Sequence, residues 1–184
     1  ALTTGTDNVA IGENALDAVT SATDNTAVGD NAAGATTTGG FNTAIGSDAL
    51  LVNSTGTYNT AVGHGALDAN TTASNNTAFG ATALSANTTG TENTALGQSA
   101  LLALTTGNYN VAVGLQALKT ITTASNNTAV GYKALDVNTA SDNTAVGFDA
   151  LGANTTGTDN VAVGSNALDA NTTGTDNTAL GDNA

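Results

Sequence analysis

The sequence contains no cysteine, proline, methionine or tryptophan, and its only aromatic residues are three tyrosines and three phenylalanines. Without cysteine no disulfide can form, which is compatible with an extracellular protein that is stabilised in another way. Alanine, threonine, asparagine and glycine dominate instead, and they cannot fill the interior of a conventional globular domain. Any buried interior must therefore be thin, which favours a stack of repeats.

Basic residues are almost absent as well. Lysine and arginine together number 2 against 15 aspartates and glutamates, and the net charge is −13. Binding to nucleic acid requires cations that neutralise phosphates, and binding to an anionic membrane surface requires the same. No apolar run approaches the length that spans a bilayer. We therefore expect neither a nucleic-acid partner nor a membrane partner.

One motif fills the chain. Its glycine recurs every 17 residues with a single interval of 16, at Gly12, Gly29, Gly46, Gly63, Gly80, Gly97, Gly114, Gly131, Gly147, Gly164 and Gly181. With this glycine as position 1, the repeat reads G-x-x-A-L-x-A-N-T-T-G-T-D-N-T-A-V. Such a period indicates a solenoid, in which each repeat buries its apolar side chains against its neighbours.

Local patterns within the repeat predict its elements. The segment N-T-A-V-G is short, β-branched and ended by glycine, which predicts a strand. The segment N-T-T-G-T has turn residues, and the one deleted residue falls in such a segment, within 138–141. The segment x-x-A-L-x-A fits either a strand or one helical turn. We expect one all-β domain over residues 1–184, a parallel β-solenoid or β-roll of about eleven 17-residue coils within a longer fibre.

The asparagine at position 14 never varies between repeats. In a stack of coils these residues form a column, and asparagine ladders satisfy side chains and backbone together. We therefore expect a structural ladder rather than ligand contacts at Asn8, Asn25, Asn42, Asn59, Asn76, Asn93, Asn110, Asn127, Asn143, Asn160 and Asn177.

The alanine at position 16 is also invariant. Side chains alternate along a strand, so if positions 15 and 17 face the interior of the coil, position 16 faces outward. Only close packing against another chain would restrict an outward site to alanine. This reasoning predicts lateral self-association through Ala10, Ala27, Ala44, Ala61, Ala78, Ala95, Ala112, Ala129, Ala145, Ala162 and Ala179.

Two stretches carry a resemblance to known families. Residues 8–12 (N-V-A-I-G) and 160–164 (N-V-A-V-G) resemble the S-V-A-I-G repeats in the heads of trimeric autotransporter adhesins. The longer pattern N-T-A-V-G-x-x-A-L-x-x-N-T-T-G is similar to repeats of bacteriophage tail fibres, and this likeness covers the whole chain. The resemblance implies β-rolls assembled as homotrimers in a fibre on a virion or a cell surface.

Residues for catalysis are few. Nucleophilic catalysis uses cysteine, or serine beside histidine, and the only histidine is His64 at a variable position. We expect no catalytic residue, no enzyme activity and no cofactor. Carboxylates one coil apart repel each other, so Asp142, Asp159 and Asp176 are candidate Ca²⁺ ligands. A solvated acidic surface that keeps fibres soluble is the favoured interpretation.

Two further surfaces are candidates for recognition. Exposed aromatic rings stack on sugars, so the aromatic residues at variable positions are candidate glycan contacts: Phe41, Tyr58, Tyr109, Tyr132 and Phe148. Local packing over the turns is the simpler interpretation. Threonine columns on a flat solenoid face resemble ice-binding proteins, although inward-facing threonines at position 15 would weaken this idea.

The sequence thus predicts a structural fibre or shaft that supports or mediates attachment to a host surface. A self-assembling extracellular or biofilm filament is the first alternative, and an ice-binding solenoid is the second. The expected partners are further copies of the chain, as a homotrimer or a filament, and a glycan or receptor on a cell surface. The expected location is extracellular, on a virion tail fibre or a cell surface.

Overall fold

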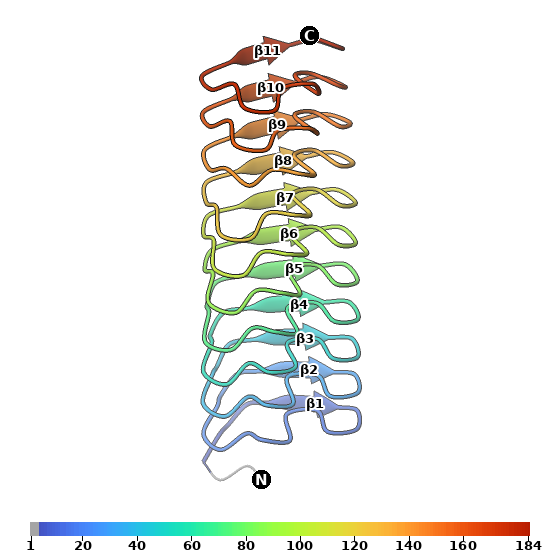
Figure 1. The fold of residues 1–184 in the computed structure, drawn as a ribbon. Coiled ribbons are helices and arrows are strands. Elements are labelled where there is room, and N and C mark those ends of the chain that lie inside the picture. The colour runs from blue at the N-terminus through green and yellow to red at the C-terminus, as the bar shows by residue number, and fades with distance from the viewer. Residues whose placement is uncertain (1–3) are drawn as a thin grey trace.

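The computed structural model describes residues 4–184, which form one continuous parallel β-solenoid (Figure 1). Eleven three-residue strands pair with their sequence neighbours in a single parallel sheet, in the order β1 to β11. They are β1 Val9–Ile11, β2 Thr26–Val28, β3 Thr43–Ile45, β4 Thr60–Val62, β5 Thr77–Phe79, β6 Thr94–Leu96, β7 Val111–Val113, β8 Thr128–Val130, β9 Thr144–Val146, β10 Val161–Val163 and β11 Thr178–Leu180. The predicted all-β parallel solenoid and the position of the strand in the repeat are confirmed.

The remainder of each coil is irregular. Residues 4–184 contain no helix, and so none that could cross a bilayer. The segment x-x-A-L-x-A, which the sequence left open between strand and helical turn, is neither of them. Its residues at positions 3 and 5 take left-handed backbone angles, as at Asp48 (φ 58°) and Leu50 (φ 56°). These angles bend the chain sharply, and they carry the leucine side chain into the coil.

The glycine at position 1 allows adjacent coils to approach each other closely. Gly80 has a φ of 136°, which residues with side chains rarely adopt, and an added Cβ would lie 2.6 Å from the carbonyl oxygen of Gly97 in the next coil. The carbonyl of each such glycine therefore occupies the space that a side chain would need. This crowding explains why position 1 is glycine in every repeat.

The interior of the rod is narrow and consists of small residues in columns. Alanines at positions 4 and 16 and leucines at position 5 are fully buried in the central coils, as at Ala95, Ala100 and Leu101. Backbone hydrogen bonds join the coils outside the strands as well, for example from Leu101 N–H to Ala117 C=O at 3.0 Å. Each coil is thus bonded to the next around most of its circumference.

The asparagines at position 14 form the expected ladder. The Asn93 side-chain amide donates to Asn76 Oδ1 at 3.2 Å and to Gly107 C=O at 2.8 Å. Its oxygen accepts from the backbone N–H of Asn110 at 3.0 Å and from the side-chain amide of Asn110 at 3.1 Å. Every donor and acceptor of this buried side chain is therefore satisfied, and the ladder joins each coil to the next.

The 16-residue repeat keeps the same register. Thr128, Ala129 and Val130 of β8 still pair with Thr144, Ala145 and Val146 of β9. The shortened turn is bridged by Asn138, whose amide donates to Ala140 C=O two residues later, whereas the equivalent Asn87 reaches Gly90 three residues later. The turn therefore absorbs the missing residue, in agreement with its predicted location.

The substitution Asn93→Ala should lower the stability of the rod strongly. It removes the acceptor of the Asn110 backbone N–H and leaves Gly107 C=O without a donor, whereas Asn76 Oδ1 still accepts from the backbone N–H of residue 93. Each buried unsatisfied group costs about 1–3 kcal/mol, so we expect the two groups to lower the free energy of unfolding by at least about 2 kcal/mol, measured by urea denaturation. The control is Asn108→Ser, because Ser74 and Ser125 at the same position accept the equivalent backbone hydrogen bonds. Equal stability of both variants would show that the ladder is dispensable.

Candidate functional site

The outer surface of the strands runs regularly along the whole rod. Within each central strand the middle residue is buried and the flanking residues at positions 15 and 17 face outward. Position 15 is threonine except at Val9, Val111 and Val161. Position 17 is always apolar, and side chains in this column such as Ile45, Phe79 and Leu96 are 40%, 53% and 44% exposed. We call the outward side chains of positions 15 and 17 the strand face.

This orientation corrects the predicted interface. The alanines at position 16 point into the coil, and those from Ala27 to Ala162 have no exposed surface in the single chain. They therefore cannot contact a second chain. Their invariance has an internal cause, because the coil is too thin for a larger side chain there. The predicted interface residues that lie inside instead are Ala27, Ala44, Ala61, Ala78, Ala95, Ala112, Ala129, Ala145 and Ala162. Ala10 and Ala179 occupy the first and last strands.

A second asparagine ladder at position 8 was missed at the sequence level. Asn87 donates to Asn70 Oδ1 at 3.2 Å, and Asn70 donates to Asn53 Oδ1 at 2.9 Å. The N-T-T segment looks like an exposed turn, yet these asparagines are fully buried. The available signal was the replacement of asparagine by the large aliphatic residues Leu104 and Ile121, which favours a position that faces the interior.

Four of the five candidate glycan-contact residues form two ring stacks along the rod. The Phe41 and Tyr58 rings lie 4.9 Å apart at an interplanar angle of 5°, and Tyr132 stacks on Phe148 at 5.4 Å. The Lys133 ammonium lies 5.6 Å from the centre of the Tyr132 ring. All five rings, including that of Tyr109, remain at least 40% exposed. In each stack, one face of each ring is therefore covered by the neighbouring ring. Glycan binding by the remaining faces stays a prediction.

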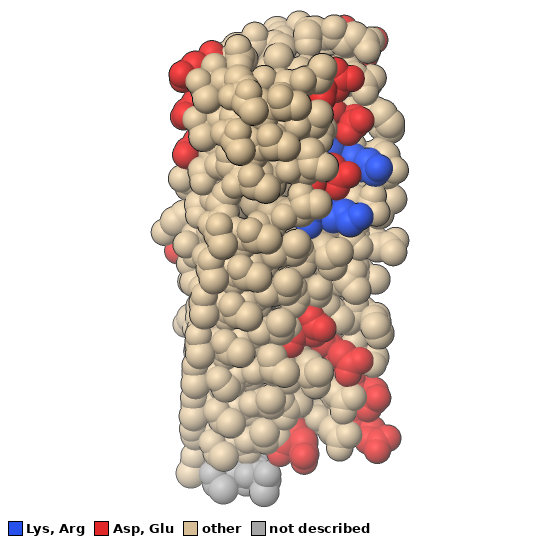
Figure 2. All heavy atoms as spheres, in the orientation of Figure 1, with Lys and Arg blue, Asp and Glu red and all other residues tan. Residues whose placement is uncertain are grey.

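Most acidic residues are exposed and lie in columns along the sides of the rod (Figure 2), whereas Asp48, Asp68, Asp136 and Asp149 are half-buried. Asp142, Asp159 and Asp176 share the position-13 column, where Asn126 donates to Asp142 Oδ1 at 3.0 Å. Within residues 4–184, no group of three or more histidines and acidic side chains is arranged to hold a metal ion. The three aspartates therefore do not converge on one point, and the geometry gives the calcium hypothesis no support.

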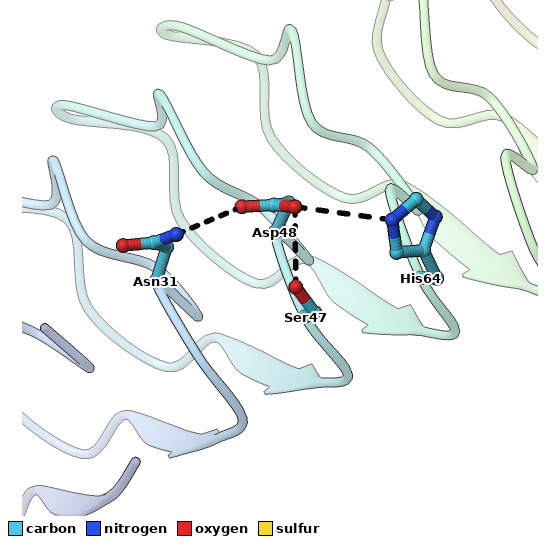
Figure 3. Close-up of polar contacts among 4 residues, drawn as sticks. All are labelled: Asn31, Ser47, Asp48 and His64. Atoms are coloured by element: carbon cyan, nitrogen blue, oxygen red, sulfur yellow. Dashed lines mark hydrogen bonds and ion pairs between the residues drawn. The ribbon is translucent and has the colours of Figure 1, made fainter. Parts of the chain in front are cut away.

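The only histidine lies in a small polar cluster (Figure 3). Asp48 accepts from the Asn31 amide and the Ser47 hydroxyl, both at 3.1 Å, and its Oδ2 lies 3.9 Å from His64 Nε2. The His64 side chain is 71% exposed. Because the serine and the histidine both face the carboxylate, the imidazole is not placed to take a proton from Ser47. The cluster can link coils but does not form a nucleophile–base pair.

One shallow depression, of about 470 Å³, interrupts the side of the rod. Gly34 leaves space where most other coils carry a side chain, between Asp17 and Ala18 of one neighbouring coil and Leu51 and Val52 of the other. Its walls are mainly apolar. The amides of Asn14 and Asn31 at its edge already bond to each other and on to Asp48. The depression therefore offers apolar contact more than converging polar groups.

Comparison with known proteins adds no relative: no family model, curated protein or solved structure matches this chain. The strand face, the aromatic stacks and the acidic columns must therefore be interpreted from their own chemistry.

Asp68 supplies a pH-dependent test of the side surface. Burial raises the pKa of Asp68 above its ordinary value of 3.8, and the charge of Asp48 adds to the rise. Because the pKa is higher in the folded state than in the unfolded state, the charged carboxylate destabilises the fold. This loss of stability is complete at a pH above the folded-state pKa, and it vanishes at a pH below the unfolded-state pKa. Asp68→Asn should therefore raise the urea midpoint at pH 7, and the gain should shrink as the pH falls and disappear below pH 3.8.

The matched control for this test is Asp169→Asn, which changes the same repeat position in a coil where the carboxylate is exposed. It should leave the urea midpoint at pH 7 almost unchanged. A lower midpoint for Asp68→Asn at pH 7 would mean that the carboxylate's hydrogen bonds to the backbone N–H groups of Asp68 and Ala69 outweigh the cost of burial.

Proposed function

We propose that this chain is a non-catalytic shaft segment of an extracellular fibre, which holds the parts attached to it at a fixed distance. The observation that carries the proposal is the continuous asparagine ladder. Hydrogen bonds to the amide oxygen at position 14 link the coils from Asn8 to Asn177, through the shortened repeat as well. A uniform rod of this kind offers support along its length rather than one deep site.

The dimensions suit a spacer. Stacked parallel strands lie about 4.8 Å apart, so the ten intervals between the eleven strands give a rod roughly 48 Å long. Each coil contacts mainly its two neighbours, so further coils lengthen the rod without changing its cross-section. The resemblance to phage tail-fibre and adhesin-head repeats favours a fibre that supports attachment to a host surface. Exposed aromatic rings and acidic columns would provide a weak, repeated surface for glycans and keep the fibre soluble.

Immunogold electron microscopy of the organism that makes the protein tests this proposal. Antibodies raised against the folded rod should label fibres that project from virions or from the cell surface, and pre-immune serum should not. Label confined to the cell interior would contradict the proposal. Label on fibre tips alone would contradict the shaft and favour a receptor-binding end.

One observation favours a second candidate, ice binding. The threonines at position 15 point outward, contrary to the expectation that had weakened this idea, and they form a column one strand apart along the sheet. Regular threonine arrays on flat solenoid faces resemble ice-binding proteins. Two features oppose it: the bulky Phe79 and Leu96 protrude beside the column, and Val111 and Val161 interrupt its hydroxyl groups.

Thermal hysteresis separates the two functions. If the chain is a shaft, solutions of the folded protein should leave the growth of ice unchanged. Hysteresis that Thr94→Tyr on the strand face abolishes, and that Thr89→Tyr in the turn of the same repeat leaves intact, would establish ice binding instead.

A further inference from the structure

The strand face is exposed over the whole length of the rod. Purely parallel sheets are normally covered on both faces, because their two sets of side chains are both apolar. Here the coil covers only the inner face. Large apolar side chains remain in contact with solvent at position 17, among them Ile45, Phe79 and Leu96 at 40–53% exposure. Contiguous exposed apolar surface of this kind indicates a binding surface.

The strand face also carries no charge along its length. None of the eleven strands contains a charged residue, whereas the 15 acidic residues of the chain occupy other positions of the repeat. Two copies of a chain with a net charge of −13 repel each other. A surface that brings two such copies together must exclude carboxylates, and the strand face does so along its full length.

Spacing and size fit a second copy of the same rod. Along the rod, outward side chains recur once per strand. Only a partner with the same period can pack its own side chains between them over the whole length of the rod. Eleven strands about 4.8 Å apart, with two side-chain columns across, give a face on the order of 500 Å². Two such faces bury about 1,000 Å², which reaches the lower limit for specific association.

We infer that copies of this chain associate side by side through their strand faces, with the apolar side chains of position 17 at the contact. This inference deepens the shaft proposal and rests on it, because lateral association would thicken and stiffen the fibre. It retains the lateral association predicted from the repeat but moves the contact from the buried alanines to the residues on either side of them. Ice is the other candidate for binding to the strand face. The protruding Phe79 and Leu96 favour a protein partner, because its side chains can pack around them.

Two leucines provide a matched test. Leu96 lies on the strand face at 44% exposure, and Leu115 lies two residues beyond β7, at position 2, at 41% exposure. Both can be changed to aspartate without burying a charge in the coil. Native mass spectrometry and analytical ultracentrifugation of the full chain should show a discrete oligomer for the wild type and for Leu115→Asp. Leu96→Asp should shift the mass to that of the monomer, with an unchanged circular dichroism spectrum.

The outcomes separate this inference from the shaft proposal. A wild-type chain that stays monomeric at concentrations of tens of micromolar would overturn the inference, and so would an oligomer that Leu96→Asp leaves intact. In both cases surface fibres labelled by the antibody would still support the shaft. A monomer that produces thermal hysteresis would identify ice as the occupant of the strand face. Absence of label from fibres would overturn the shaft proposal even if the oligomer forms.

Discussion

A buried amide that must satisfy four hydrogen bonds is the constraint on which this molecule depends. Each coil is too narrow to hold a layered core of large side chains, so cohesion between coils must come from polar groups placed within it. Asn93 shows the arrangement, since its amide nitrogen donates to Asn76 in the preceding coil and to Gly107 in the following one, and its oxygen accepts two hydrogen bonds from Asn110 in the following coil. The geometry works only when every coil places its asparagine at the same height, so the ladder fixes the register of all other columns.

The invariant small residues follow from this register. Gly80 must leave room for the carbonyl of Gly97, and Ala95 must fit inside the coil beside the ladder. Leucine at position 5 fills the remaining space, and a left-handed backbone angle directs it inward, as at Leu101 (φ 53°). Non-glycine residues seldom take such angles, and the backbone energy that they cost is offset here by the burial of the leucine.

The period, the parallel stacking, the strand segment and the location of the turn could all be predicted from sequence, because each depends on spacing alone. The direction of the strand side chains could not. Valine and threonine at positions 15 and 17 looked like the core, since their side chains are larger than alanine. In the structure the coil is thin enough that alanine fills it, as Ala112 shows between the outward Val111 and Val113. Hydrophobic size indicates burial only when the width of the interior is known.

Some features of the candidate surfaces could likewise be predicted from sequence, and others could not. Stacking of Phe41 on Tyr58 follows from a separation of one period, which places the two rings in one column. The ladder at position 14 was evident from its invariance. The ladder at position 8 was hidden because the asparagine-threonine-threonine segment also has the composition of a solvent-exposed turn. Its inward orientation depends on left-handed angles earlier in the coil, at positions such as Ser99 and Leu101, which the composition does not reveal.

The shortened coil between Gly131 and Gly147 has a consequence for how such a rod can change over time. A residue lost in the turn alters one local bridge, at Asn138, and leaves the strands and the amide column in place. A residue lost from a strand segment would instead turn the following side chains of that strand to the opposite face of the sheet. Small insertions and deletions are therefore tolerated on one side of the rod only, whereas duplication or loss of whole coils changes its length freely. Recombination between repeats in the gene can thus change the length of such a rod while its cross-section stays the same.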